Sequence, residues 1–169
     1  KINAPVPAGL SVDGPLAYSP DSQRLVYVTN ASPPTDTVAS ELWIADLDGG
    51  EQNLLVSLPL GRHFSFEYSS QPMYDSSRLN YRAGATVDGR VDLWSIPLSG
   101  GPPTKLNGAL VAGGDVFDFV RSPIDDTVTY ISDQKVDQRS ELYIVPAAGG
   151  NVVKLSHALS GNWIIVGAD

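Results

Sequence analysis

The chain has 169 residues and a formal net charge of -8 at pH 7, with 11 lysine and arginine residues against 19 aspartate and glutamate residues. A nucleic-acid-binding protein needs clustered cations to displace counterions from phosphates, and the scattered basic residues here exclude that class. The absence of cysteine excludes disulfides, thiol nucleophiles and thiolate metal sites. No apolar run approaches the roughly 20 residues that cross a bilayer, so we expect no membrane insertion.

The first predicted elements are four short strands at about 15–19, 24–29, 40–47 and 52–56. Tyrosine, tryptophan, valine and isoleucine dominate these runs, and turn residues separate them. The segment Ser19-Pro20-Asp21 predicts a turn between the first two strands. The segment Asp48-Gly49-Gly50 predicts a tight hairpin between the last two, because glycine adopts positive φ without strain.

The same order of strands is predicted twice more along the chain. The motif Glu41-Leu42-Trp43 returns as Asp92-Leu93-Trp94 and as Glu141-Leu142-Tyr143, and a glycine pair follows each copy. A period of about 50 residues is typical of repeat folds such as propellers. The second set of strands is predicted at about 62–69, 78–83, 91–98 and 103–107, and the third at about 115–122, 127–132, 140–147 and 151–156.

The apolar pattern indicates how these strands pack. No run shows the 3.6-residue periodicity of a helix, so we expect almost no helix. The runs Leu25–Val28 and Leu42–Ala45 are apolar at successive positions, which is typical of strands covered on both faces. Neighbouring blades cover a propeller blade in that way. We therefore predict an all-β fold of β-propeller-type blades, in which Trp43, Trp94 and Tyr143 fill the gaps between blades.

The predicted architecture is three four-stranded antiparallel repeats plus partial strands at both ends. We place the blades at about 11–56, 61–107 and 114–156 of one partial propeller over 1–169, with 157–169 starting a further blade. Lys1–Val6 is expected to be an outermost strand, and Trp163–Val166 an innermost one. Because closed propellers need about four to eight blades, we expect a segment of a larger propeller, with an uncovered apolar face on the first and third blades.

The turn and strand motifs resemble those of a known family. Ser19-Pro20-Asp21, a Leu-x-Tyr strand and the run from Glu41 to Gly50 together resemble the TolB-type β-propeller repeat. The third copy has Ile124 in place of the turn aspartate, and the second departs further. The stretches 105–116 and 141–155 are also similar to tandem repeats of secreted bacterial proteins. The resemblance implies a propeller of about six blades outside the cytoplasm, and it implies no particular activity, because sites are grafted on folds.

Few residues are candidates for catalysis. The nucleophile-elbow pattern G-x-S-x-G does not occur in the sequence, and the two histidines are His63 and His157. His63 lies in a predicted inner strand and His157 in a linker, where packing or solvation is the expected role of each. Two histidines without cysteine do not predict a zinc site. We therefore predict no catalytic, cofactor-binding or metal-binding residues and no cofactor.

The loops between second and third strands hold the remaining candidates for ion binding. Asp36, Asp88-Gly89, and Asp133 with Asp137 could gather calcium, but no D-x-D-x-D-G ligand loop is present, so solvated turns are expected. Paired carboxylates for glycoside cleavage are equally unspecific in an acidic chain. The sequon Asn30-Ala31-Ser32 is followed by Pro33, and no glycan is expected there.

These observations favour a non-catalytic propeller scaffold or binding module that is secreted, periplasmic or on the cell surface. Its partner would be another protein or the remainder of its own polypeptide, and self-association through exposed blade faces is open. Two alternatives also stay open: part of the propeller that gates a prolyl-oligopeptidase-type serine peptidase, and a structural repeat unit of a surface layer or filament. An α/β-hydrolase segment downstream would decide for the peptidase.

Overall fold

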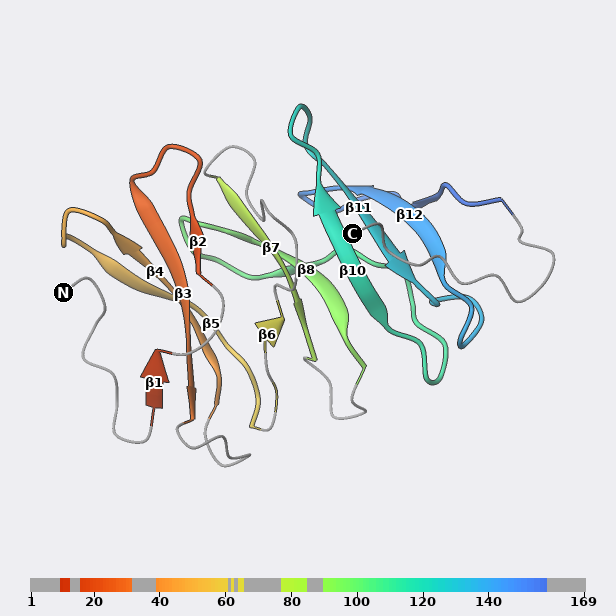
Figure 1. Ribbon diagram of the computed structural model, residues 1–169, viewed down its shortest axis with the longest axis horizontal. Coiled ribbons are helices and arrows are strands. Elements are labelled where there is room, and N and C mark those ends of the chain that lie inside the picture. The colour runs from red at the N-terminus through yellow and green to blue at the C-terminus, as the bar shows by residue number, and fades with distance from the viewer. Residues whose placement is uncertain are drawn as a thin grey trace.

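The computed structural model describes residues 10–12, 16–31, 39–60, 62, 64–65, 77–84 and 90–157. Within these ranges the chain forms three antiparallel sheets and no helix, and the sheets stand side by side in chain order (Figure 1). No described segment is a helix long and apolar enough to cross a membrane. The predicted all-β fold of three antiparallel repeats is therefore confirmed.

The first sheet, blade 1, has five strands. β1 (Leu10–Val12) and β2 (Ala17–Tyr18) both pair with β3 (Arg24–Ala31), which is followed in the sheet by β4 (Glu41–Asp46) and β5 (Gln52–Ser57). The sequence predicts the last four but misses β1, because three residues are too few to show strand alternation. The strands predicted at Lys1–Val6 and Trp163–Val166 lie outside the described residues, as does all of the predicted further blade after residue 157.

Blades 2 and 3 have four strands each. Blade 2 contains β6 (Phe64–Ser65), β7 (Arg78–Ala83), β8 (Asp92–Pro97) and β9 (Thr104–Lys105). Blade 3 contains β10 (Val116–Arg121), β11 (Thr127–Ser132), β12 (Glu141–Pro146) and β13 (Val153–Lys154). The outer strands β9 and β13 are shorter than predicted, because only two residues of each pair with the neighbouring strand.

The strand registers show that the blades are built alike. In each blade, a tyrosine of one central strand pairs with an aromatic residue of the next strand: Tyr27 with Trp43, Tyr81 with Trp94, and Tyr130 with Tyr143. We call the face with this aromatic pair the near face. The opposite, far face carries Val26, Val28, Leu42 and Ile44 in blade 1; Asn80, Arg82, Leu93 and Ser95 in blade 2; and Thr129, Ile131, Leu142 and Ile144 in blade 3.

Two hydrophobic cores lie between the blades. The first core joins the far face of blade 1, including Val28 and Leu42, to the near face of blade 2, including Tyr81. The second core joins Leu93 on the far face of blade 2 to the near face of blade 3, including Tyr130. The central strands of blade 2 are thus covered by a blade on both faces, and those of blade 1 by a blade on the far face.

The three aromatic residues expected between blades differ in burial. Tyr143 is 1% exposed and belongs to the second core, as expected. Trp94 is half-buried and packs against the edge of the first core. Trp43 is half-buried and belongs to neither core, because no described blade precedes blade 1.

The prediction of an uncovered near face on blade 1 is wrong for its central side chains. Tyr27, Thr29 and Ala45 are only 3%, 2% and 1% exposed. Part of the cover is local, because Trp43 Nε1 donates a hydrogen bond of 3.1 Å to Glu41 Oε2, two residues back on the same face. This bond holds the indole along its own strand.

Candidate functional site

An acidic residue at the start of the third main strand recurs in every blade, as Glu41, Asp92 and Glu141. In blade 2, Asp92 Oδ1 accepts hydrogen bonds from Asn107 Nδ2 at 2.9 Å and from Lys105 Nζ at 2.6 Å. Asn107 Oδ1 in turn accepts the Leu93 amide at 2.8 Å. The carboxylate therefore fastens the outer strand to the centre of the sheet.

Glu141 is the most heavily partnered of these acids. It accepts hydrogen bonds from Tyr143 Oη at 2.7 Å, Lys154 Nζ at 2.6 Å and Arg139 Nη2 at 3.0 Å. Burial opposes its ionisation, but the hydrogen bonds from Lys154 and Tyr143 and the charges of Lys154 and Arg139 outweigh it, so the pKa of Glu141 lies below its ordinary value. A carboxylate held ionised by so many donors stabilises the blade and is a poor proton acceptor.

The tyrosines beside Glu141 are also held neutral. Burial, and then the Glu141 carboxylate, raise the pKa of Tyr143. Tyr130 stacks on Tyr143 with ring centroids 5.3 Å apart, and burial raises the pKa of Tyr130 to about 12. Tyr130 Oη donates to Gln134 Oε1 at 3.0 Å. Each of these side chains is at most 3% exposed, so the cluster is a packed part of the protein interior.

Of the two loop acids predicted in blade 3, the structure gives Asp133 a structural role. Asp133 is 2% exposed; its Oδ1 accepts the Asp115 amide at 2.6 Å, and its Oδ2 accepts the Gln138 amide at 2.9 Å. Both carboxylate oxygens of Asp133 are therefore bonded to backbone amides. Asp137 is exposed to solvent. The described part of the chain contains no group of three or more histidine or acidic side chains placed to hold a metal ion.

The other predicted candidates are placed as follows. His157 is exposed after β13, and Asn30 is half-buried near the end of β3. His63, Asp36, Asp88, Gly89 and Ser32 lie outside the described residues. The structure brings none of the described candidates, Asn30, Asp133, Asp137 and His157, together with another as a reactive pair.

Two buried arginines lie at the junction between blades 2 and 3, and the sequence analysis missed them. Arg82 Nη1, on the far face of blade 2, donates to the carbonyl oxygens of Val116, at 3.0 Å, and Phe117 in blade 3. Arg121 Nη1, from β10 of blade 3, donates to Asn80 Oδ1 at 2.6 Å. Arg121 also forms an ion pair with the exposed carboxylate of Asp126. The one sequence signal for these arginines is that each lies on a predicted strand, and the two strands belong to adjacent blades.

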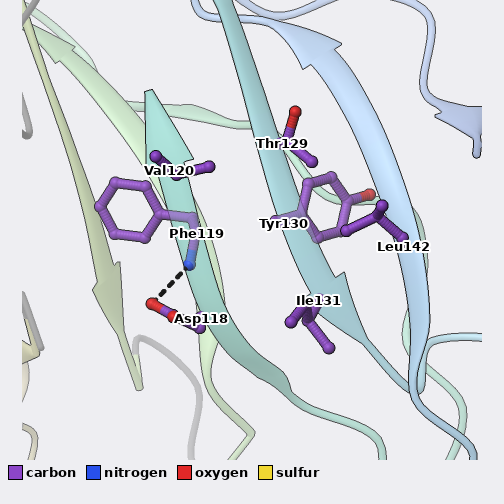
Figure 2. Close-up of a pocket in the computed structure, with 7 residues that line it drawn as sticks. All are labelled: Asp118, Phe119, Val120, Thr129, Tyr130, Ile131 and Leu142. Carbon is purple, nitrogen blue, oxygen red and sulfur yellow. Dashed lines mark hydrogen bonds between the residues drawn. The ribbon is translucent and has the colours of Figure 1, made fainter. Parts of the chain in front are cut away.

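The far face of blade 3 is partly exposed to solvent. A hollow of about 100 Å³ on it is lined by Asp118, Phe119, Val120, Thr129, Tyr130, Ile131 and Leu142 (Figure 2). Val120 is 56% exposed, and Ile131 and Leu142 are half-buried. The matching residues of blade 1, Val28 and Leu42, are 1% and 0% exposed. No described strand covers this face, so it is the candidate binding surface.

A second hollow lies at the junction of blades 1 and 2. Its volume is about 230 Å³, and its lining is mostly polar: Arg24, Ile44, Asp46, Glu51, Asn53, Leu98 and Ser99. At the next junction the equivalent hairpin packs more closely, because a Cβ on Gly149 would lie 2.8 Å from Thr104 Cγ2, whereas a Cβ on Gly100 would meet nothing within 4 Å. The polar hollow thus reflects looser packing of one hairpin, and it has room for water between its charged groups.

Comparison with known proteins agrees with this architecture. No protein-family model matches the sequence, and no curated protein matches it. An oligogalacturonate lyase in complex with manganese is similar in structure, with a TM-score of 0.66 and 19% identity over 89% of this chain and 43% of that one. The oligogalacturonate lyase of Vibrio parahaemolyticus gives a TM-score of 0.65 and 15% identity over 88% of this chain and 42% of that one.

A peptidase shows the same likeness. Dipeptidyl peptidase 4 of Porphyromonas gingivalis is similar with a TM-score of 0.63 and 15% identity, over 92% of this chain and 21% of that one. The chain therefore spans less than half the length of each of these proteins. At such identities the likeness shows the fold alone, which is a run of β-propeller blades.

Proposed function

We propose that this chain is part of a non-catalytic β-propeller scaffold outside the cytoplasm, and that it serves to bind protein. The observation that carries the proposal is the stack of three blades around two continuous cores, ending in a partly exposed apolar face. An apolar face of this kind is an association surface in soluble proteins. A TolB-type propeller, as the turn and strand motifs suggest, is the kind of scaffold we propose.

The placement of the polar residues supports a scaffold. The buried carboxylates Asp92, Asp133 and Glu141 bind backbone amides or neighbouring side chains. The buried arginines hold one blade to the next. Groups that bind backbone and neighbouring strands in this way serve the packing of the blades. The proposed location outside the cytoplasm rests on the similarity to secreted repeats.

Turnover assays test the proposal directly. We expect the purified chain to show no activity on oligogalacturonate, on proline-containing peptides or on simple esters. Robust turnover of any of them that is lost in His63→Ala or His157→Ala would overturn the proposal. A hydrolase segment with a nucleophile elbow downstream in the reading frame would instead make the blades part of a peptidase propeller.

A further inference from the structure

The far face of blade 3 occupies the position that the neighbouring blade covers at both other junctions. Val28 and Leu42 of blade 1 are 1% and 0% exposed beneath blade 2. Arg82 and Leu93 hold the same register positions in blade 2 and are 7% and 0% exposed beneath blade 3. In blade 3 the register pair is Ile131 and Leu142, and both are half-buried. The repeat therefore indicates that a blade belongs on this face.

The residues of this face indicate which kind of surface it fits. Ile131 and Ile144 repeat the aliphatic side chains of blade 1, where blade 2 has the polar Arg82 and Ser95, and Leu142 matches a leucine in both blades. The aliphatic far face of blade 1 packs against the near face of blade 2, where Tyr81 meets Phe64 edge-on with ring centroids 5.5 Å apart. An aromatic near face therefore fits the hollow beside Ile131 and Leu142.

Asp118 adds an electrostatic requirement. It is the one charged side chain that lines the hollow, and its Oδ1 accepts only the Phe119 amide, at 2.8 Å, among the bonds drawn in Figure 2. A carboxylate that becomes covered loses its hydration, which is costly unless a cation pairs with it. The covering surface must therefore bring a positive charge to this point.

The junction between blades 2 and 3 shows where such a cation would come from. There Arg121, on the first strand of the following blade, reaches Asn80 on the far face of blade 2. In blade 3 the position of Asn80 is held by Thr129. Ile131 lies two residues after Thr129 on the same strand and face, and Asp118 of the adjacent strand pairs with Ile131. Two residues span about 7 Å along a strand, which is within the reach of an arginine side chain.

We propose, building on the scaffold function above, that this face receives a fourth blade of the same propeller. That blade has an aromatic near face, and its first strand supplies an arginine or lysine to Asp118. A second copy of this chain fits less well, because the near face of its blade 1 already buries Tyr27, Thr29 and Ala45. Two copies joined through their blade 3 far faces would enclose both Asp118 carboxylates in one apolar interface, which is unfavourable.

A single introduced thiol tests the docking. Because the chain has no cysteine, Ile131→Cys creates the one thiol available for labelling with a maleimide. We expect the thiol to react in the 169-residue chain and to react at least about tenfold more slowly in the product of the complete reading frame. Ile124→Cys is the control: its position is 82% exposed in the turn after β10, so its rate should be equal in both proteins.

Equal rates for Ile131→Cys in the two proteins would overturn the proposal, whether or not the reading frame is longer than this chain. Protection that rises with the concentration of the 169-residue chain, together with a doubled mass in light scattering, would also overturn it in favour of a second copy. A downstream hydrolase domain would end the scaffold proposal but would leave this result standing. The two proposals can therefore fail separately.

A charge reversal tests the cation. In the full product carrying Ile131→Cys, Asp118→Lys should return the labelling rate toward that of the 169-residue chain. Asp125→Lys, in the exposed turn after β10, should leave the protection unchanged. In the 169-residue chain, Asp118→Lys should keep the β-sheet circular dichroism spectrum, which shows that the variant folds. Full protection in the Asp118→Lys variant would overturn the assignment of a cation.

Discussion

The junction between blades 1 and 2 and the junction between blades 2 and 3 use the same strand positions with different chemistry. At the first, Val28 and Leu42 meet an aromatic and aliphatic near face. At the second, Asn80 and Arg82 are buried at 0% and 7% exposure, and Asn80 Oδ1 and Arg82 Nη1 form hydrogen bonds with groups of blade 3. Stacking of blades therefore requires that these positions be covered, and it accepts either apolar residues or polar residues that bond across the junction.

The two kinds of junction should differ in how strictly they position the blades. Aliphatic side chains can repack when their neighbours shift. The arginines at the second junction need particular acceptors, the carbonyl oxygens of β10 and the Asn80 side chain. A buried donor that loses its acceptor is costly, so we expect the second junction to tolerate less displacement. Four predictions test this difference.

The apolar junction should show the largest effect of a single change. Leu42 is 0% exposed in the first core, so Leu42→Ala should leave a cavity, and it should lower the free energy of unfolding by about 2–5 kcal/mol. Leu54→Ala, in the same sheet but at a 46% exposed position, should change it by less than about 0.5 kcal/mol. Urea unfolding followed by circular dichroism measures both. Equal, small effects would mean that blades 1 and 2 do not pack together in solution.

A substitution at the polar junction should lower the free energy of unfolding by less than one at the apolar junction. A second substitution should restore most of that loss. Arg121→Met leaves Asn80 Oδ1 buried without its donor and should lower the free energy of unfolding by about 1–3 kcal/mol. The double variant Arg121→Met with Asn80→Leu replaces both partners by apolar groups and should recover most of the loss. If the double variant is as unstable as the sum of the single variants, the bond between Arg121 and Asn80 does not set the stability of this junction.

The carboxylate cluster of blade 3 should make stability depend on acid pH. The pKa of Glu141 is lowered in the folded chain from an ordinary value of 4.5, so its stabilising effect is present above that value and is lost as pH falls through the lower folded pKa. Unfolding midpoints of the wild type and Glu141→Gln should therefore differ at pH 7 and converge as the pH falls below about 4.5. The exposed control Glu51→Gln should follow the wild type. A constant difference between wild type and Glu141→Gln at all pH values would contradict this role.

The smallest effect on stability is expected when a residue of blade 2 is replaced by its counterpart from blade 1. Leu54 and Lys105 hold the same register position, beside Trp43 and Trp94. Lys105→Leu removes the ion pair with Asp92 but leaves the bond from Asn107, so it should cost no more than about 1 kcal/mol. The loss should shrink further in 1 M salt, because Lys105 is 38% exposed and its charge is screened. A loss above about 3 kcal/mol would show that Asp92 depends on the lysine.

The sequence predicted that blade 3 exposes an apolar face, but it did not predict which residues form the hollow. Successive apolar residues in the first blades indicated strands covered on both faces, so a third blade without a covering neighbour should expose apolar groups. Burial shows this at Val120 and in the half-buried Ile131 and Leu142. The role of Asp118 could not be predicted, because a β-bulge shifts the register of β10 between Val116 and Asp118. Such a shift changes which face a side chain meets.

The sequence by itself determined the number of repeats, the order of their strands and the equivalence of positions such as Trp43, Trp94 and Tyr143. It could do so because turn residues and the two-residue period of strands act over short distances along the chain. Tertiary structure alone decided that Arg82 and Arg121 join two blades, that Asp133 binds backbone amides, and that Tyr27 is buried. Those outcomes depend on contacts between strands far apart in the sequence, and such contacts form only when whole sheets stack face to face.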